Sequence, residues 1–267
     1  MKIVLWIGNE ANQKALANKI HSRFPLSGII TETRIHKNNF SISKILEKVF
    51  EKVSLSSIGK AWWGMKEHYE KRYPSYPDTS LLDVENINSA EAYDFTKNIA
   101  PDLIIVSGTR LVKERMLSIA PSIGILNLHT GLSPYVKGGP NCTNWCVATK
   151  QFHLIGNTIM WIDAGIDTGN LVTTAFTELT GDEDLPSLHL KVMEHAHSLY
   201  VDAIDFLAKG GTSNVKQSAI AEGITYYTRE WGLQQKIALA RNSSLLKSCV
   251  ASGELAKKRS LIKTVKI

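Results

Sequence analysis

An asparagine and a histidine, spaced two residues apart, end an apolar run at residues 125–129. If this run is a strand, Asn127 and His129 point to the same side, because the side chains of a strand alternate between its two faces. A neutral amide can stabilise an oxyanion without titrating, and an imidazole can exchange a proton near neutral pH. On residue types alone, a strand that simply ends in capped polar groups is the more common explanation of such a pair.

Asp167 is the third residue that could take part in this chemistry. It lies in the turn at residues 162–169, and a carboxylate near an imidazole raises the pKa of the ring and orients it. We expect Asn127, His129 and Asp167 to converge at the carboxyl ends of strands. Together they suit attack on a neutral carbonyl whose oxygen becomes negative, as in acyl transfer to an amine.

The sequence offers no side chain with the surroundings of a covalent nucleophile. Ser133 lacks the G-x-S-x-G elbow, and neither Cys142 nor Cys146 has a motif that would favour a thiolate. Direct attack by the amine is therefore favoured over an acyl-enzyme intermediate.

Composition and charge limit the class of protein. With 43% hydrophobic and 21% charged residues, the chain of 267 residues is globular in composition rather than disordered or fibrous. The net charge of +6 is spread along the chain, so nucleic-acid binding is not indicated, since such proteins usually cluster their basic residues.

Three cysteines show no metal-site spacing, so no metal is expected. No signal segment or membrane span is visible, and we expect a cytoplasmic protein with no membrane partner.

The elements that must position the three polar residues alternate along the chain. Apolar runs predict strands, and apolar residues at helical spacing predict helices. The predicted strands are residues 3–8, 28–30, 84–87, 102–108, 124–129, 154–162 and 171–178, and the predicted helices are residues 10–23, 41–72, 89–99, 112–119, 142–149 and 185–207. This order is typical of a doubly wound parallel sheet. We expect a catalytic domain at residues 1–210 and a small C-terminal extension at residues 211–267.

Two segments are candidates for contacts with a substrate. The turn at residues 8–12 lacks the G-x-G-x-x-G fingerprint, so no nicotinamide cofactor is expected, although its backbone N–H groups could hold an anion. A plain connection without a ligand is an equal alternative. The segment 62–73 combines aromatic and basic residues, which can stack on a base and meet a pyrophosphate. A helix that packs its two tryptophans into the core is the stronger interpretation of this segment.

The wider sequence around Asn127 resembles the folate-dependent formyltransferase superfamily. The resemblance rests on Asn-x-His at residues 127–129, Leu-Ser-Pro-Tyr-Val-Lys-Gly-Gly-Pro at 132–140, and Ile-Asp-Thr-Gly at 166–169. It implies a Rossmann-like, mostly parallel α/β sheet with helices on both faces. It also implies that N10-formyltetrahydrofolate, a cosubstrate consumed in each turnover, donates a formyl group to an amine.

The same resemblance implies a role for each polar residue. His129 would transfer a proton beside the formyl carbon, and Asn127 would hold the developing oxyanion. Asp167 would pair with His129 and help to position a water or proton path. The pterin would bind largely to backbone groups of two segments, made up of Ser107, Gly108, Thr109, Arg110, Leu111, Val112, Ile162 and Asp163.

The residues that follow His129 differ between branches of this superfamily. The purine-pathway and initiator-tRNA enzymes usually read His-Pro-Ser-Leu-Leu-Pro, whereas this chain has His-Thr-Gly-Leu-Ser-Pro at residues 129–134. That segment is similar to the sugar N-formyltransferases, especially those that act on GDP-perosamine. The implied acceptor is a GDP- or dTDP-linked 4-amino-4,6-dideoxy sugar. Its N-formyl product would enter a surface polysaccharide such as the O-antigen of lipopolysaccharide.

On this interpretation we expect the nucleotide sugar to contact the first turn, the 62–73 segment and the loop after His129. The candidate acceptor-binding residues are Gly8, Asn9, Trp63, Lys66, Arg72, Tyr135, Lys137 and Gly138. We also expect a homodimer formed through the C-terminal extension. The alternatives are a methionyl-tRNA or glycinamide-ribonucleotide formyltransferase, a related formyl-folate hydrolase, and a non-catalytic nucleotide- or folate-binding module.

Overall fold

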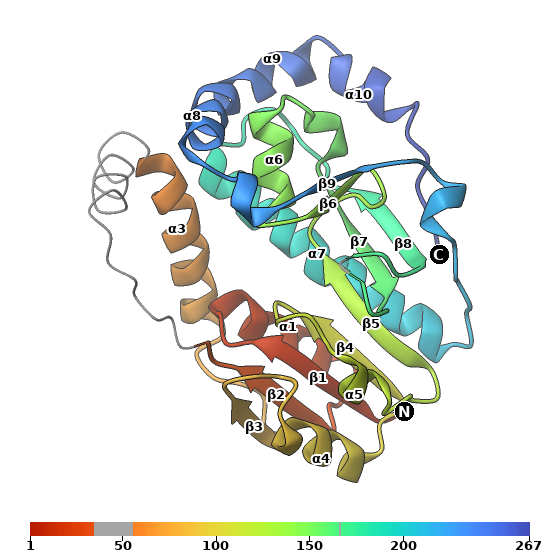
Figure 1. Ribbon diagram of the computed structural model, residues 1–267. Coiled ribbons are helices and arrows are strands. Elements are labelled where there is room, and N and C mark those ends of the chain that lie inside the picture. The colour runs from red at the N-terminus through yellow and green to blue at the C-terminus, as the bar shows by residue number, and fades with distance from the viewer. Residues whose placement is uncertain (35–55, 166) are drawn as a thin grey trace.

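A seven-stranded sheet forms the centre of the computed structural model, which describes residues 1–34, 56–165 and 167–267. The strand order is β3-β2-β1-β4-β5-β7-β8 (Figure 1). The first five strands in this order run parallel, and β7 and β8 are antiparallel to their neighbours. The strands are β1 (Ile3–Gly8), β2 (Gly28–Glu32), β3 (Leu81–Val84), β4 (Leu103–Ser107), β5 (Gly124–His129), β7 (Gly156–Trp161) and β8 (Leu171–Phe176). The prediction of a mostly parallel, Rossmann-like α/β fold is confirmed.

Helices cover both faces of this sheet, as predicted. Successive residues of β1 point to opposite faces, so Leu5 packs with residues of α1 and α7, whereas Trp6 packs with residues of α4 and α5. The helices are α1 (Ala11–His21), α3 (Ser56–Arg72), α4 (Ala90–Ile99), α5 (Glu114–Leu117), α6 (Cys142–Ala148), α7 (Leu185–Ala208), α8 (Leu233–Asn242), α9 (Leu246–Ala251) and α10 (Glu254–Arg259). Among the described residues, no helix is long and apolar enough to cross a membrane.

Polar caps explain where two of these helices begin. The Ser89 side chain accepts a hydrogen bond from the backbone N–H of Ala92 at the start of α4, and Asp184 accepts one from Ser187 at the start of α7. Each cap satisfies a backbone donor that has no partner inside its helix. The helix predicted at residues 185–207 therefore begins directly after its N-cap, Asp184.

Three details differ from the sequence-based expectations. The strand predicted at 84–87 lies earlier, as the edge strand β3, because Asp83 accepts hydrogen bonds from the hydroxyls of Thr31 and Thr33 and so joins β3 to β2. The helix predicted at 112–119 shortens to one turn, α5. A second, two-stranded sheet of β6 (Val136–Gly138) and β9 (Ile224–Tyr226) was not predicted, since such short strands carry no clear alternation. The 41–55 part of the predicted helix 41–72 lies outside the described residues.

The C-terminal segment packs along β7 and β8. Leu239, Leu246 and Leu255 join one apolar cluster with residues that follow β5. Val265 exchanges hydrogen bonds with Thr174 of β8, where its N–H donates to Oγ1 at 2.9 Å and its carbonyl accepts from the Thr174 N–H at 2.9 Å. The last residues of the chain thereby cover the β8 edge of the sheet (Figure 1).

Candidate active site

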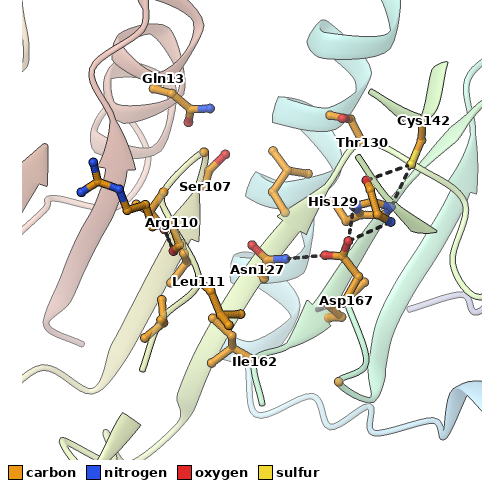
Figure 2. Close-up of a pocket in the computed structure, with 18 of the residues that line it drawn as sticks. Gln13, Ser107, Arg110, Leu111, Asn127, His129, Thr130, Cys142, Ile162 and Asp167 are labelled. Atoms are coloured by element: carbon orange, nitrogen blue, oxygen red, sulfur yellow. Dashed lines mark hydrogen bonds and ion pairs between the residues drawn. The ribbon is translucent and has the colours of Figure 1, made fainter. Parts of the chain in front are cut away.

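A cavity of about 520 Å³ lies where β4 and β5 end, and all three candidate catalytic residues line it. Figure 2 shows Asn127, Asp167 and His129 together on one wall, with Leu111 and Ile162 at one end and Gln13 at the other. Every residue of the two segments predicted to hold the pterin also lines this cavity, namely Ser107, Gly108, Thr109, Arg110, Leu111, Val112, Ile162 and Asp163. The structure therefore brings both sets of predicted residues to one site.

Asp167 connects the other two polar residues. Its Oδ1 accepts a hydrogen bond from Asn127 Nδ2 at 3.4 Å, and its Oδ2 lies 3.3 Å from His129 Nδ1. The backbone N–H of Gly138 also donates to Oδ2, at 3.2 Å. Asp167 has a left-handed backbone with φ 51°, a conformation that aspartate tolerates better than most residues. Gln217 holds this turn by donating from Nε2 to the carbonyls of Asp167 and Gly169.

The route by which Asp167 reaches His129 was not foreseen. Because β7 runs antiparallel to β5, the turn after β7 begins beside the amino-terminal half of β5, where the N–H of Ile162 donates to the carbonyl of Ile125. The turn then runs back along β5 to place Asp167 next to the end of that strand. The three groups converge as expected, through a returning loop rather than through adjacent parallel strand ends.

The surroundings of His129 favour its protonated form. Burial opposes the charge and is the largest influence on its pKa, but the Asp167 carboxylate outweighs it, with further contributions from Cys142 and the Val136 carbonyl, and raises the pKa to about 9. Nε2 lies 3.3 Å from the Val136 carbonyl. Each ring nitrogen thus faces an acceptor, an arrangement that suits an imidazolium with two donors.

Cys142 is a neighbour of His129 that sequence reasoning did not place in the site. Its Sγ lies 3.4 Å from His129 Nε2 and 3.5 Å from the carbonyl of Gly138. Burial raises the pKa of the Cys142 thiol although His129 acts in the opposite direction. The side chain is therefore a buried thiol at neutral pH, in keeping with the absence of a nucleophile motif.

Gly131 gives His129 the space that it occupies. A Cβ atom at this position would lie 2.4 Å from His129 Nε2 and 2.9 Å from Cys142 Sγ, closer than real Cβ contacts. The Thr-Gly pair after His129 is one of the features in which this chain resembles the sugar N-formyltransferases. Packing beside His129 also requires the glycine of this pair. Only a residue without a side chain fits between the imidazole and the thiol.

The predicted acceptor-binding residues are only partly brought to the cavity. Gly138 lines it. Gly8 lies next to the carbonyl of Gly108, which a Cβ at Gly8 would approach to 2.9 Å. Asn9 is engaged elsewhere, donating to Thr33 and accepting from Tyr76.

The remaining candidates for acceptor binding do not line the cavity. Lys66 pairs with Glu70 and lies over the ring of Trp63, which is 68% exposed. The exposed Arg72 lies at the end of α3, and Lys137 lies in β6. The Tyr135 hydroxyl is bonded to the backbone of Lys263.

Trp62, the neighbour of the predicted Trp63, lines the cavity and is 55% exposed. The interpretation that α3 packs both tryptophans into the core is wrong. The helix packs instead through Ala61, Met65 and Tyr69. The spacing of Ala61, Met65 and Tyr69 is the helical period, so the sequence contained a signal for the true buried face.

Residues 48–204 match the formyl transferase family, and the chain belongs to this family. The curated relatives it matches include the methionyl-tRNA formyltransferase of Citrifermentans bemidjiense, 29% identical over 137 residues. That match covers 51% of this chain and 42% of the relative. The chain thus spans less than half the length of this relative.

Solved structures of sugar N-formyltransferases share the fold over most of the chain. One from a Shewanella species has a TM-score of 0.58 at 14% identity, over 90% of this chain and 87% of that one. An N-formyltransferase from Helicobacter canadensis, solved with folinic acid and dTDP-3-aminofucose, has a TM-score of 0.55 at 15% identity. That match covers 93% of this chain and 82% of the other. At such low identity these likenesses show the fold.

Proposed function

We propose that this protein transfers a formyl group from N10-formyltetrahydrofolate to the amine of a nucleotide-linked amino-dideoxy sugar. The observation that supports this most is the Asn127–Asp167–His129 connection inside the cavity. It puts an amide donor, a carboxylate and a cationic imidazole around one point, as transfer of a carbonyl group to an amine requires.

The cavity has a suitable place for the pterin and the formyl group. Leu111, Val112 and Ile162 supply apolar side chains next to the backbone groups of the same segments, which suits a flat heteroaromatic ring with polar edges. Arg110 is fixed here, because its backbone N–H and guanidinium both donate to the buried Glu32 carboxylate. Folate bound at this end would direct its formyl group towards Asn127.

The residues then act on the reacting atoms as follows. The acceptor amine attacks the formyl carbon, and Asn127 donates to the oxygen as it becomes negative. The Asn127–Asp167 contact is long, at 3.4 Å, so the oxyanion can replace Asp167 as the amide's acceptor. As the new C–N bond forms and the bond to N10 breaks, the protonated His129, held by Asp167, donates a proton to N10. The neutral imidazole then takes up the proton that the amine loses, which restores its cationic form.

An amino sugar is the acceptor that we favour. The His-Thr-Gly-Leu-Ser-Pro segment supports it, and so does the Helicobacter canadensis structure, whose shared fold covers 93% of this chain and which holds a nucleotide sugar. The second candidate is methionyl-tRNA, because the curated relative from Citrifermentans bemidjiense acts on it. We propose further that the acceptor is a GDP- or dTDP-linked 4-amino-4,6-dideoxyhexose such as GDP-perosamine. The reaction would take place in the cytoplasm, and the N-formyl product would become part of a surface polysaccharide.

Residues 1–210 would be the catalytic unit in this proposal, and residues 211–267 an extension that supports a homodimer. Leu233, Ile237 and Leu261 are among the exposed apolar side chains of the extension that are available for such a contact. Light scattering of the purified protein should give the mass of two chains. A monomer mass at micromolar concentration would exclude the dimer.

An acceptor panel tests the proposed activity. GDP-, dTDP- and UDP-linked amino sugars and methionyl-tRNA are each incubated with the protein and N10-formyltetrahydrofolate. We expect a formyl mass gain on at least one sugar and none on the tRNA. Formylation of the tRNA alone, with a rate that falls steeply as salt rises, would support the second candidate instead.

A further inference from the structure

The helices α1, α3 and α7 each contribute to the lining of the cavity, and Gln13 of α1 lies at the end away from Leu111 and Ile162 (Figure 2). Asn12 and Gln13 come from α1, Trp62 from α3 and Met193 from α7. We call these four residues the helical wall. None of them belongs to the segments assigned to the pterin or to the catalytic residues.

Gln13 is the residue of this wall whose amide oxygen has no hydrogen-bond partner. Its side chain is 7% exposed, and among the described residues its Oε1 is buried without a partner. Its side chain extends into the cavity (Figure 2). Gly108 leaves room for it, since a Cβ there would lie 2.8 Å from Gln13 Nε2. An unpaired buried amide is costly, so this position points to a ligand that completes it.

The chemistry of the wall is neutral. Its side chains are two carboxamides, an indole and a thioether. A phosphate would find no cation among these four side chains. Carboxamides that donate and accept beside an exposed aromatic face suit instead an uncharged ring with hydroxyls and an apolar side.

We infer that the helical wall binds the hexose ring of the acceptor, with Gln13 hydrogen-bonded to a ring hydroxyl and Trp62 packed on the apolar face of the sugar. This assignment rests on the proposed function and adds to it the residues that select the acceptor. It replaces Trp63 by Trp62, and it puts the diphosphate outside the wall.

Steady-state kinetics of two matched pairs of variants test the assignment. Gln13→Leu removes the amide at similar volume, and Gln13→Asn keeps the amide on a shorter side chain. Trp62→Ala removes the aromatic face, and Trp63→Ala is its control on the same helix. We expect Gln13→Leu and Trp62→Ala each to raise KM for the amino sugar about tenfold, the loss of one hydrogen bond or stacking contact. Gln13→Asn should be milder, Trp63→Ala should match the wild type, and the Kd of folinic acid should be unchanged throughout.

The outcomes separate this inference from the proposed function. If the wild type formylates a sugar but Gln13→Leu and Trp62→Ala leave its KM unchanged, the assignment of the wall is wrong and the proposed function stands. A weaker Kd for folinic acid in Gln13→Leu would assign Gln13 to the folate and also overturn the inference. If the wild type formylates only tRNA or no acceptor, the proposed function fails and the sugar assignment fails with it.

Discussion

At the scale of single residues, Asp167 connects the other two candidate catalytic residues. It accepts from Asn127 with one oxygen and faces His129 with the other, so one carboxylate sets both the direction of the amide and the charge of the imidazole. In the free protein His129 is cationic at neutral pH, because its pKa is raised to about 9. A cation at this place favours the negative charge that appears on the formyl oxygen.

Replacing Asp167 by Asn should shift the pH dependence of activity to lower pH. Without the carboxylate, burial alone dominates and lowers the pKa of His129. The falling limb of kcat/KM, expected near pH 9 in the wild type, should move towards or below neutrality. Histidine NMR titrations and a pH–rate profile measure both shifts, and an unchanged limb would show that Asp167 does not hold the proton on His129.

The same shift affects stability. The pKa of His129 is raised from 6.5 to about 9 on folding, so the protonated pair stabilises the fold fully below pH 6.5. This contribution is lost as the pH rises through 9. Urea unfolding should therefore show that the free energy of unfolding of the wild type falls, relative to that of Asp167→Asn, as the pH rises from 6.5 to 9. A difference between the two proteins that stays constant across this pH range would contradict the assignment.

Gly131→Ala tests whether the space beside His129 is essential. The added Cβ would meet His129 Nε2 and Cys142 Sγ, so the imidazole must move, and activity should fall by roughly 100-fold or more, as expected for misplaced acid–base groups. Gly59→Ala is the control, since a Cβ there meets nothing within 4 Å. Circular dichroism should show both variants folded. Equal activity of the two would mean that His129 tolerates displacement.

At the scale of elements, the sheet was predictable and the approach of the loops was not. β1 and β4 are nearly continuous apolar runs whose residues are buried on both faces, and such runs are a strong strand signal. The antiparallel direction of β7 depends on pairing with β5 across the sheet, which no local pattern encodes. For the same reason Cys142, Gln13 and Trp62 could not be placed at the cavity from their sequence positions.

Arg259 shows how the C-terminal segment is fixed to these elements. Its guanidinium donates to the carbonyls of Ile155 and Thr177 and lies over the ring of Phe176. Arg259→Ala should lower the free energy of unfolding by about 2 kcal/mol, since hydrogen bonds from a charged donor contribute more than neutral ones. Lys258→Ala, which removes an exposed pair with Glu254, is the control and should show no measurable change. Equal denaturation midpoints for both variants would contradict this account.

At the scale of the whole molecule, the candidate catalytic residues and the segments proposed to bind folate come from the carboxyl ends of β4 and β5 and the loop after β7. The side of the cavity proposed for the acceptor comes from the helices α1, α3 and α7. The Asn-x-His and Asp-containing motifs could be assigned a chemical role through the resemblance to the formyltransferase superfamily. The residues of α3 that were predicted to bind the acceptor from their aromatic and basic character mostly face solvent, because composition alone does not show which face of a helix is buried.

The most direct test of the account is single-turnover formyl transfer by His129→Ala, with N10-formyltetrahydrofolate and whichever acceptor the wild type formylates. Cys146→Ala, in the same α6 region but outside the cavity lining, serves as the folded control. Mass spectrometry follows the formylated product with both substrates saturating. We predict that His129→Ala lowers the rate by roughly 100- to 10,000-fold while folinic acid binds as before. A rate within a few-fold of the wild type would contradict the claim that the Asn127–Asp167–His129 site carries out the transfer.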